Sequence, residues 1–289
     1  MPTNAPETMG VIYRLQLSQL HPHPQNPFSI RDDQAMLDLI QSVQSHGVLV
    51  PAIARPRPDG EYEIIAGHRR KHASELAGLD FMPVVVLDLN DDEAIIQLVD
   101  SNIQRENILP SERAKAYKMR MEAMKRQGAR TDLTSPNISA KFRSDDELGQ
   151  EVGVSGDTIR NYASLTNLVP ELMQMVDEGR IKLSPAYQIA ALPHNEQSLL
   201  LDTIESEQAT PSLSQAQRMK RLSQNGELNE DVLLEIMMEQ KKPVRNDITL
   251  SGEKLRKYFP KSYSPIQMEN VIFKLLEAWQ RKRQRDQSR

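Results

Sequence analysis

The sequence predicts an α+β fold made of a small N-terminal α/β domain, an all-α domain with a helix-turn-helix, and a helical C-terminal segment. Strand-like runs alternate with helix-like runs over residues 11–105. Helix-like runs alone follow over residues 106–240, and a last apolar helix lies in residues 244–289. A chain of 289 residues has room for two or three such small domains.

The composition excludes several classes of protein. The chain has no cysteine, which excludes disulfides, cysteine nucleophiles and thiolate metal sites. Its formal net charge is −4, so any contact with nucleic acid has to come from local basic patches. No apolar run approaches the length of a membrane span, and the N-terminus has no apolar signal core. We therefore expect a soluble cytoplasmic protein with no membrane partner.

Strands and helices alternate in the N-terminal domain after a leader over residues 1–10. The first helix is expected to open at Asp32 and Asp33, because acidic residues favour the positive end of the helix dipole, and Gly47 ends it. Its apolar residues recur at helical spacing: Met36, Leu39, Ile40 and Val43. Strands are expected over four runs between loops rich in proline and glycine: residues 11–17, 50–54, 61–64 and 83–87.

A glycine turn joins the strand at residues 61–64, whose alternation predicts a half-buried strand, to a helix expected at residues 68–76. Gly67 breaks the strand, and Arg69 and Arg70 lie in the first turn of the helix. A helix N-terminus supplies free N–H groups and arginines supply forked positive charge, so the turn predicts an anion-binding cradle. The same pattern also occurs at ordinary strand-to-helix turns.

A second polar cluster closes the next helix, which is expected to begin at Asp91. It consists of Asn102, Gln104 and Arg105. These side chains could bind a ligand or form a solvated helix end. Their presence together with the Gly67 turn favours a ligand-binding role.

A long basic helix is expected over residues 110–127, ended by Gly128. Residues 105–130 contain eight Lys or Arg and three Glu, a local excess of five positive charges. Such a run is commonly a solvated face. Because this one lies between a candidate anion site and a candidate DNA-binding motif, Lys125 and Arg126 are candidate phosphate contacts.

Residues 145–165, which follow a linker over residues 129–143, have the spacing of a helix-turn-helix. Gly149 lets two helices cross closely, Gly153 makes the turn, and Ser155 is a good N-cap for the second helix. Seven positions fit the pattern: Leu148, Gly149, Val152, Gly153, Val154, Ile159 and Tyr162. The alternative is an ordinary helical hairpin with a glycine in its turn.

The second helix of this motif leaves five residues facing outward: Gly156, Asp157, Arg160, Asn161 and Ser164. Arginine and asparagine can pair bidentately with guanine and adenine in the major groove. The predicted DNA-binding residues come from this helix and its cap and from the long basic helix: Ser155, Gly156, Asp157, Arg160, Asn161, Lys125 and Arg126.

Helices alone are expected after the motif, with apolar spacing typical of a core, over residues 172–176, 184 onward, 196–205, 212–223 and 230–240. The methionine pairs Met173/Met175 and Met237/Met238 are interpreted as packing residues.

A last helix is expected from about Ser264, beyond a linker at residues 241–243, and it ends in a basic run at residues 281–285. It carries an apolar stripe: Met268, Ile272, Leu275 and Trp279. The stripe could dock on its own domain, pair with a second copy or lie on a membrane. Because the stripe is narrow, docking or self-association is favoured.

The order of these motifs resembles the ParB family of DNA-partition proteins. The matching residues are Ser42-Val43, Gly47, Pro51, Gly67-His68-Arg69-Arg70 and Asn102-Ile103-Gln104-Arg105. The family pattern is Ser-Ile, Gly, Pro, Gly-Glu-Arg-Arg and Glu-Asn-x-Gln-Arg, with a helix-turn-helix after it. Residues 110–114 and 124–128 resemble the ParB/RepB-like branch on mobile elements of Gram-positive bacteria.

The resemblance implies a ParB/sulfiredoxin-like N-terminal domain that binds CTP with Mg²⁺, and a clamp that closes and spreads on double-stranded DNA from a centromere-like site. It also implies a ParA-type ATPase as partner, a homodimer, and a place on the nucleoid in the cytoplasm. The implied nucleotide-binding residues are Ser42, Gly47, Pro51, Gly67, His68, Arg69, Arg70, Asn102, Gln104 and Arg105. The candidate metal ligands are Asn102 and, as a substitute, Asp100.

Two departures from the family pattern concern carboxylates. The family's glutamates are replaced by His68 and Ser101 in this chain. Asp100 lies one residue earlier, and one residue on a helix turns a side chain by about 100°. Loss of two carboxylates removes charge that would coordinate Mg²⁺, so we expect CTP to act as a switch with weak or absent hydrolysis.

Two rival functions remain. The first is a helix-turn-helix transcriptional regulator that uses no nucleotide. The second is an enzyme on the same fold: the missing cysteine excludes sulfiredoxin chemistry, the helix-turn-helix argues against a small-molecule kinase, and no carboxylate cluster supports a nuclease.

Overall fold

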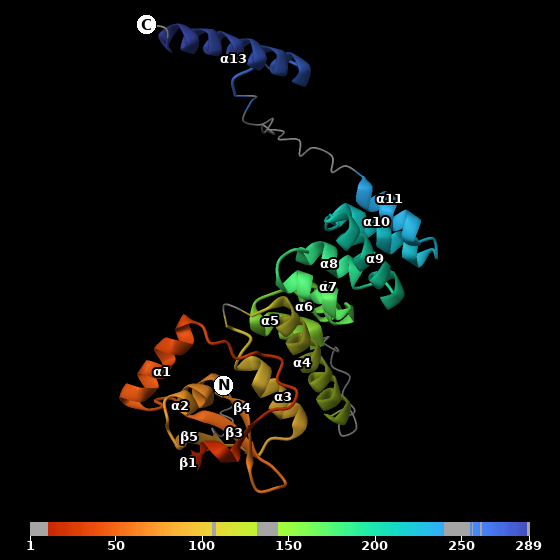
Figure 1. Ribbon diagram of the computed structural model, residues 1–289. Helices are drawn as coiled ribbons and strands as arrows, with labels where there is room; N and C mark the ends of the chain where they lie inside the picture. The colour runs from red at the N-terminus through yellow and green to blue at the C-terminus, as the bar shows by residue number, and fades with distance from the viewer. Residues whose placement is uncertain are drawn as a thin grey trace. The chain divides into compact units, whose positions relative to one another are not determined.

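The computed structural model describes residues 11–105, 108–131, 144–239, 255, 257–260 and 262–287. Its contacts divide the chain into two units, Met1–Glu239 and Gln240–Arg289 (Figure 1). Within the described residues, no helix is both long and apolar enough to cross a membrane. The expected leader, the linker at residues 241–243 and most of the linker at residues 129–143 lie outside the described residues.

One mixed sheet forms the centre of the N-terminal domain. Its order is β1-β5-β3-β4-β2, with β2–β4 and β3–β5 parallel and β1–β5 and β3–β4 antiparallel. The strands are β1 (Ile12–Gln16), β2 (Leu20–Pro22), β3 (Ala52–Pro56), β4 (Tyr62–Ala66) and β5 (Phe81–Val86). All of them except β2 match strands predicted from the sequence; the three residues of β2 overlap a loop that contains several prolines.

Strand β4 is buried on both faces, whereas its alternating sequence predicted a half-buried strand. Ile64 packs among sheet residues such as Ala54 and Val84. Ile65 packs on the opposite side with Leu98, because successive side chains of a strand face opposite ways. Both faces are therefore covered at the strand that leads into the glycine turn.

Three helices pack on this sheet or on one another: α1 (Gln34–His46), α2 (His68–Leu76) and α3 (Asp91–Asp100). Asp33 caps α1 by accepting a hydrogen bond from Met36 N at 2.9 Å. Asn90 and Glu93 form a capping box at the start of α3. Helix α2 has the bounds that Gly67 and the residues after it predicted.

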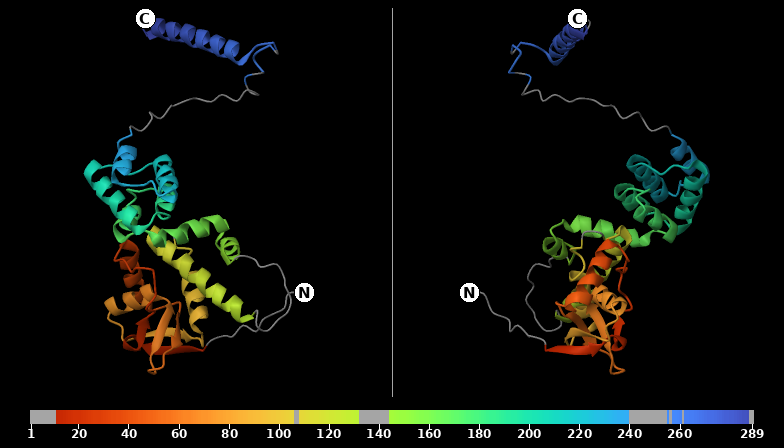
Figure 2. Two further views of the ribbon diagram at one scale, coloured as in Figure 1. Left: turned by 90° about the vertical axis from the view of Figure 1, so that its right-hand side faces the viewer. Right: turned by 60° about the vertical axis from the view of Figure 1, so that its left-hand side comes forward.

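Helix α4 (Pro110–Thr131) joins the sheet domain to the helical region. It packs against α3 and also against α5 and α6, and Figure 2 shows it in yellow-green beside the sheet domain. The predicted end at Gly128 is wrong, because α4 continues to Thr131. One glycine costs a helix only about 1 kcal/mol, too little to stop it without a further breaker.

The helices after α4 are α5 (Ser144–Val152), α6 (Gly156–Ser164), α7 (Pro170–Asp177), α8 (Leu183–Ile189), α9 (His194–Glu207), α10 (Leu213–Gln224) and α11 (Glu230–Met238). Helices α5 and α6 bury Leu148 and Ile159 in the same cluster as Leu98 of α3. Helices α7 to α11 build a separate apolar core. Met175 and Met237 are buried there as expected, but Met238 is 63% exposed, so its interpretation as a packing residue is wrong.

Helices α5 and α6 form the predicted helix-turn-helix. Leu148 and Ile159 are fully buried between them. A Cβ on Gly149 would lie 2.6 Å from the carbonyl oxygen of Val154, so only glycine permits this crossing. Gly153 adopts φ +74° in the turn. Val154 fits the sequence pattern, but it is 38% exposed and so is not a buried contact between the two helices.

The second unit contains α13 (Pro265–Gln287), which begins next to Ser264 as predicted. Ser264 Oγ caps the helix by accepting from Gln267 N at 3.3 Å. Met268 is buried, but Leu275 and Trp279 are more than half exposed. Within this unit, the apolar stripe is therefore only partly covered.

Candidate anion pocket and nucleic-acid interface

A pocket of about 190 Å³ lies where the Gly67 turn meets the end of α3. Seven of the predicted residues or their neighbours line it: Gly67, His68, Arg69, Arg70, Ser101, Asn102 and Arg105. The two polar clusters, separated by about one helix and one strand in the sequence, thus come together. Ser42, Gly47, Pro51 and Gln104 belong to the predicted set but do not line this pocket.

Gly67 has a backbone that only glycine adopts without strain. Its φ is +106°, and an added Cβ would lie 2.8 Å from Cβ of Ala52. No side chain caps α2 at Gly67, and the first turn of α2 contains no acidic residue. The N–H groups of that turn therefore keep the unsatisfied donors and positive dipole end that bind anions.

Arg69 and Arg70 have different partners. Arg70 Nη1 donates to the carbonyl oxygens of Val50 and Pro51, each at 2.6 Å, and burial lowers the pKa of Arg70. Arg69 Nη2 donates to Asp33 Oδ1 at 3.0 Å. The two arginines thus fix the loop after α1 and the start of α1 against the pocket.

Arg105 brings a third guanidinium to the pocket. Its Nη1 donates to Asn102 Oδ1 at 3.3 Å. Burial lowers the pKa of Arg105, and repulsion from Arg69 lowers it further. Because an arginine stays protonated at any physiological pH, the pocket carries a concentrated positive charge.

His68 occupies the position of the glutamate in the family pattern. Burial lowers the pKa of His68 to about 4, and the nearby charges of His23, Lys71 and Arg105 act in the same direction. Its Nε2 atom is buried and has no hydrogen-bond partner. The imidazole is therefore neutral at pH 7 and supplies no negative charge.

The predicted metal ligands are not brought together. Asn102 Nδ2 donates to the Leu98 carbonyl oxygen at 2.9 Å, so Asn102 Oδ1 alone is left to accept. Asp100 does not line the pocket, and its carboxylate pairs with Arg120 of α4 at 2.6 Å. Within the described residues, no three His, Cys, Asp or Glu side chains are grouped to hold a metal ion.

The loop before α1 forms one wall of the pocket, and this wall was not predicted from the sequence. The loop residues that line the pocket are Asn26, Phe28, Ser29 and Ile30. The backbone N–H of Ser29 donates to Glu112 Oε1 at 3.0 Å, and the N–H of Leu109 donates to Glu112 Oε2 at 3.1 Å. In the sequence, Glu112 shows only the preference of an acid for the first turn of a helix. A contact between residues 83 positions apart has no local signature.

The second helix of the helix-turn-helix, α6, presents only part of the predicted set outward. Ser155 caps α6 by accepting from Thr158 N at 3.2 Å, and Asp157 and Asn161 are exposed. Gly156 is buried against Asp146, so its prediction as an outward-facing residue is wrong. A Cβ at Gly156 would overlap Oδ1 of Asp146 in α5, so a side chain there would require the Asp146 carboxylate to move.

Arg160, the predicted base contact, is held within the helix-turn-helix. Its guanidinium pairs with the buried carboxylate of Asp145 and with the exposed carboxylate of Asp157. The Arg160 side chain is still 39% exposed. Asp145 therefore orients Arg160, while Asp157 competes with any external partner for the same donors.

The two basic residues predicted on α4 differ in their contacts. Lys125 is exposed. Arg126 Nε pairs with Oδ1 of the buried Asp92 at 2.6 Å, although half of its side chain remains exposed. Arg126 thus joins α4 to α3.

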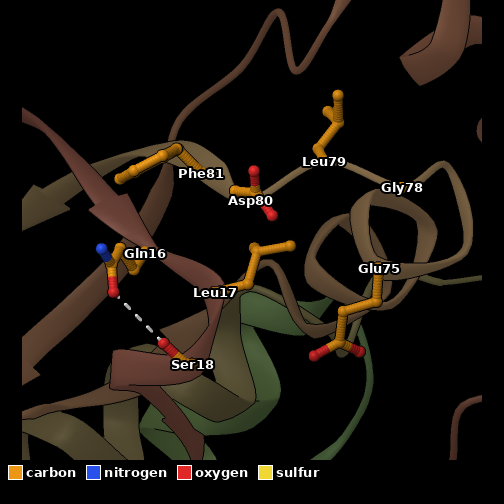
Figure 3. Close-up of a pocket in the computed structure, with 8 residues that line it drawn as sticks. All are labelled: Gln16, Leu17, Ser18, Glu75, Gly78, Leu79, Asp80 and Phe81. Atoms are coloured by element: carbon orange, nitrogen blue, oxygen red, sulfur yellow. Dashed lines mark hydrogen bonds between the residues drawn. The ribbon is translucent and has the colours of Figure 1, made fainter.

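Another hollow, of about 540 Å³, lies beside the loop between α2 and β5 (Figure 3). Glu75 and Asp80 line it, and none of its lining residues is cationic. Two carboxylates beside the hollow disfavour an anionic ligand. The hollow is therefore a poorer candidate for an anion site than the pocket at Gly67.

Two family models match this chain. The ParB N-terminal domain matches residues 2–103, and the ParB helix-turn-helix domain matches residues 137–211. The first match contains most of the pocket and the second contains the helix-turn-helix.

Similar proteins include the chromosome-partitioning protein Spo0J of Thermus thermophilus, 32% identical over 187 residues. That match covers 65% of this chain and 62% of that protein. The probable chromosome 1-partitioning protein ParB of Deinococcus radiodurans is 31% identical over 195 residues, 68% of this chain and 61% of that protein. Stage 0 sporulation protein J of Bacillus subtilis is 29% identical over 252 residues, 86% of this chain and 79% of that protein. The chain thus spans about three fifths of the first two relatives.

Two solved structures of C-terminally truncated ParB from Caulobacter crescentus are also similar. The complex with the centromeric parS site has a TM-score of 0.45 and 25% identity, and the match covers 74% of this chain and 99% of that chain. The complex with CTP-gamma-S has a TM-score of 0.32 and 29% identity, over 63% of this chain and 93% of that chain. Both TM-scores lie below 0.5, so family membership rests on the sequence matches.

Proposed function

This chain belongs to the ParB family, and from that premise we propose that it binds a centromere-like site in double-stranded DNA and uses CTP as a switch. The pocket at Gly67 would hold the nucleotide, and α6 would read the DNA. Partition of a chromosome, a plasmid or a mobile element would be the result. The resemblance to the branch on mobile elements stays a prediction.

One observation carries this proposal: helix α4 is shared by the two sites. Glu112, in its first turn, holds Ser29 of the pocket wall, and the rest of α4 packs on α5 and α6. A ligand that reorders the pocket wall would therefore act on the helix that supports the helix-turn-helix. Such a shared element is what a nucleotide-gated change in DNA binding requires.

The volume of the pocket is sufficient for the phosphates of CTP but small for the whole nucleotide. Ligand pockets commonly measure about 300–1,000 Å³, and this one measures about 190 Å³. The phosphates would meet the N–H groups of α2 and the guanidinium groups of Arg69, Arg70 and Arg105. The loop after α1, which Arg70 holds through Pro51, would lie beside the base, with Ser42 and Gly47 shaping it and Gln104 and Arg105 bracing the pocket.

The residues present do not form a magnesium site. Mg²⁺ in nucleotide sites is bound by one or two carboxylates together with phosphate oxygens, and none of the residues lining this pocket is a carboxylate. No catalytic step is therefore assigned to a metal. Hydrolysis of CTP is expected to be weak or absent, so CTP would be a switch rather than a substrate.

Specific DNA contact is assigned to α6, with Arg160 and Asn161 at the base edges and Lys125 at the phosphates. Two partners belong to the same proposal. A second copy would pair through the exposed stripe of α13. A ParA-type ATPase would act on the DNA-bound protein.

The deciding experiment is crosslinking and mapping of protein-bound DNA in cells, with the unchanged protein and with Arg69→Ala. A sharp peak with broad shoulders that collapse in the variant would support nucleotide-gated spreading. A sharp peak without shoulders for both proteins would instead support a transcriptional regulator that uses no nucleotide. Arg57→Ala is a control, because Arg57 pairs with Asp59 in an exposed turn away from the pocket.

A further inference from the structure

The carboxylates adjoining the pocket at Gly67 all have partners within the protein. Asp33 accepts from Arg69 and also caps α1 through the same oxygen. Glu112 accepts from Ser29 and Leu109. Asp100 pairs with Arg120 and lies outside the lining. A divalent cation entering with a nucleotide would therefore find no carboxylate in the pocket lining, and to reach Glu112 or Asp100 it would have to break one of these contacts.

The other donor atoms of the pocket are poor ligands for a hard cation. Magnesium binds oxygen in preference to imidazole nitrogen, and His68 presents a buried, unpartnered Nε2. The amide oxygen of Asn102 accepts from Arg105. A cation bound to Asn102 Oδ1 would thus share that oxygen with a guanidinium group of like charge, which is unfavourable.

The positive charge that a metal would supply is already present. Arg69, Arg70 and Arg105 line the pocket together with the uncapped N-terminus of α2. Guanidinium groups bind phosphate oxygens in forked pairs without a metal. Neutral His68 adds no negative charge to the pocket, whereas a glutamate in its place would cancel part of the charge of the arginines.

We propose that this pocket holds the triphosphate of its nucleotide without a divalent cation, with arginines and the α2 N-terminus in place of the metal. This inference rests on the proposed nucleotide function of the same pocket. It also explains why CTP would be held rather than hydrolysed, because the metal ordinarily neutralises the charge that develops during phosphoryl transfer.

The test is calorimetric titration of the full chain with CTP in two buffers, one containing MgCl₂ and one containing EDTA. The dissociation constants are expected to agree within about threefold. Binding that is more than about threefold weaker in EDTA would overturn the cation-independence and leave the nucleotide function standing. No binding in either buffer would overturn the proposed nucleotide function itself.

Substitution of His68 provides the second arm. His68→Glu is expected to make binding more than about threefold weaker in EDTA than in MgCl₂, because the new carboxylate would repel phosphate unless a cation lies between them. His46→Glu is the matched control, since His46 is exposed at the end of α1 and away from the pocket lining. Equal binding of the His68→Glu variant in both buffers would contradict the role assigned to His68.

Discussion

Arg120 Nε of α4 donates to Asp100 Oδ1 at the end of α3 across 2.6 Å, and the Arg120 side chain is only 4% exposed. The same guanidinium pairs with Glu151 of α5. One buried charge therefore connects the helix that leads into the pocket to the first helix of the helix-turn-helix. The contact also explains why the Asp100 side chain does not line the pocket.

Arg120→Ala is expected to lower the free energy of unfolding by about 2–4 kcal/mol, because two carboxylates lose a charged partner and a buried side chain leaves a cavity. Urea unfolding would measure the change. Arg57→Ala is the matched control: the side chains of the Arg57–Asp59 pair are 34% and 48% exposed, so its loss should cost less than about 1 kcal/mol. Equal losses for the two variants would show that Arg120 does not join the helices.

Gly67→Ala is expected to abolish CTP binding and to destabilise the N-terminal domain, because it combines a positive φ with a clash against Ala52. Gly60→Ala is a matched comparison, since Gly60 has φ +84° and no atom within 4 Å of an added Cβ. That variant should carry only the backbone cost of about 1–2 kcal/mol. Calorimetric titration and thermal unfolding of both variants would separate the clash from the backbone strain.

Arg160→Ala is expected to weaken binding to the specific DNA site by about 1–3 kcal/mol while affecting unrelated DNA little. Because Asp145 is buried and loses its partner, the folded fraction of the variant must be checked by circular dichroism. Lys125→Ala should lower affinity for all DNA and reduce the salt-dependence slope by about 0.9. Equal losses of Arg160→Ala on specific and unrelated DNA would refute α6 as the base-reading helix.

The partly buried His68 predicts loss of stability in acid. Its pKa is lowered from 6.5 to about 4 in the folded chain, so between these values the unfolded chain binds a proton that the folded chain does not. Stability therefore falls as pH drops from about 6.5 to about 4, by up to about 3 kcal/mol in total. His68→Gln should remove this part of the pH dependence. The free energy of unfolding of both proteins would be measured at pH 7 and pH 5. The unchanged protein is expected to lose more stability than His68→Gln between these two pH values. Equal losses for the two proteins would contradict the prediction.

Leu275→Asp is expected to convert a dimer into a monomer if the stripe of α13 pairs with a second copy, because a charge at an apolar interface is costly to bury. Light scattering would measure the mass in solution. Gln280→Asp adds a charge to the same helix at an exposed polar position and should leave the mass unchanged. A mass unaffected by Leu275→Asp would argue against the stripe as the dimer contact.

The sequence by itself determined the features that depend on near neighbours. Helix α2 has the bounds that Gly67 and its helical spacing predicted, and Leu148 and Ile159 pack as the helix-turn-helix pattern requires. Caps, turns and periodicity act over a few residues, so their physical causes can be identified in the order of the chain.

Only the tertiary structure decided which partner each charged side chain takes. Asp100 was a candidate metal ligand by position, yet it turns to Arg120, 20 residues away in the sequence. Glu112 holds Ser29 across 83 residues, and Gly156 is buried against Asp146 rather than exposed. Such pairings follow from how helices and loops distant in the sequence come together in space, and spacing along the chain carries no record of them.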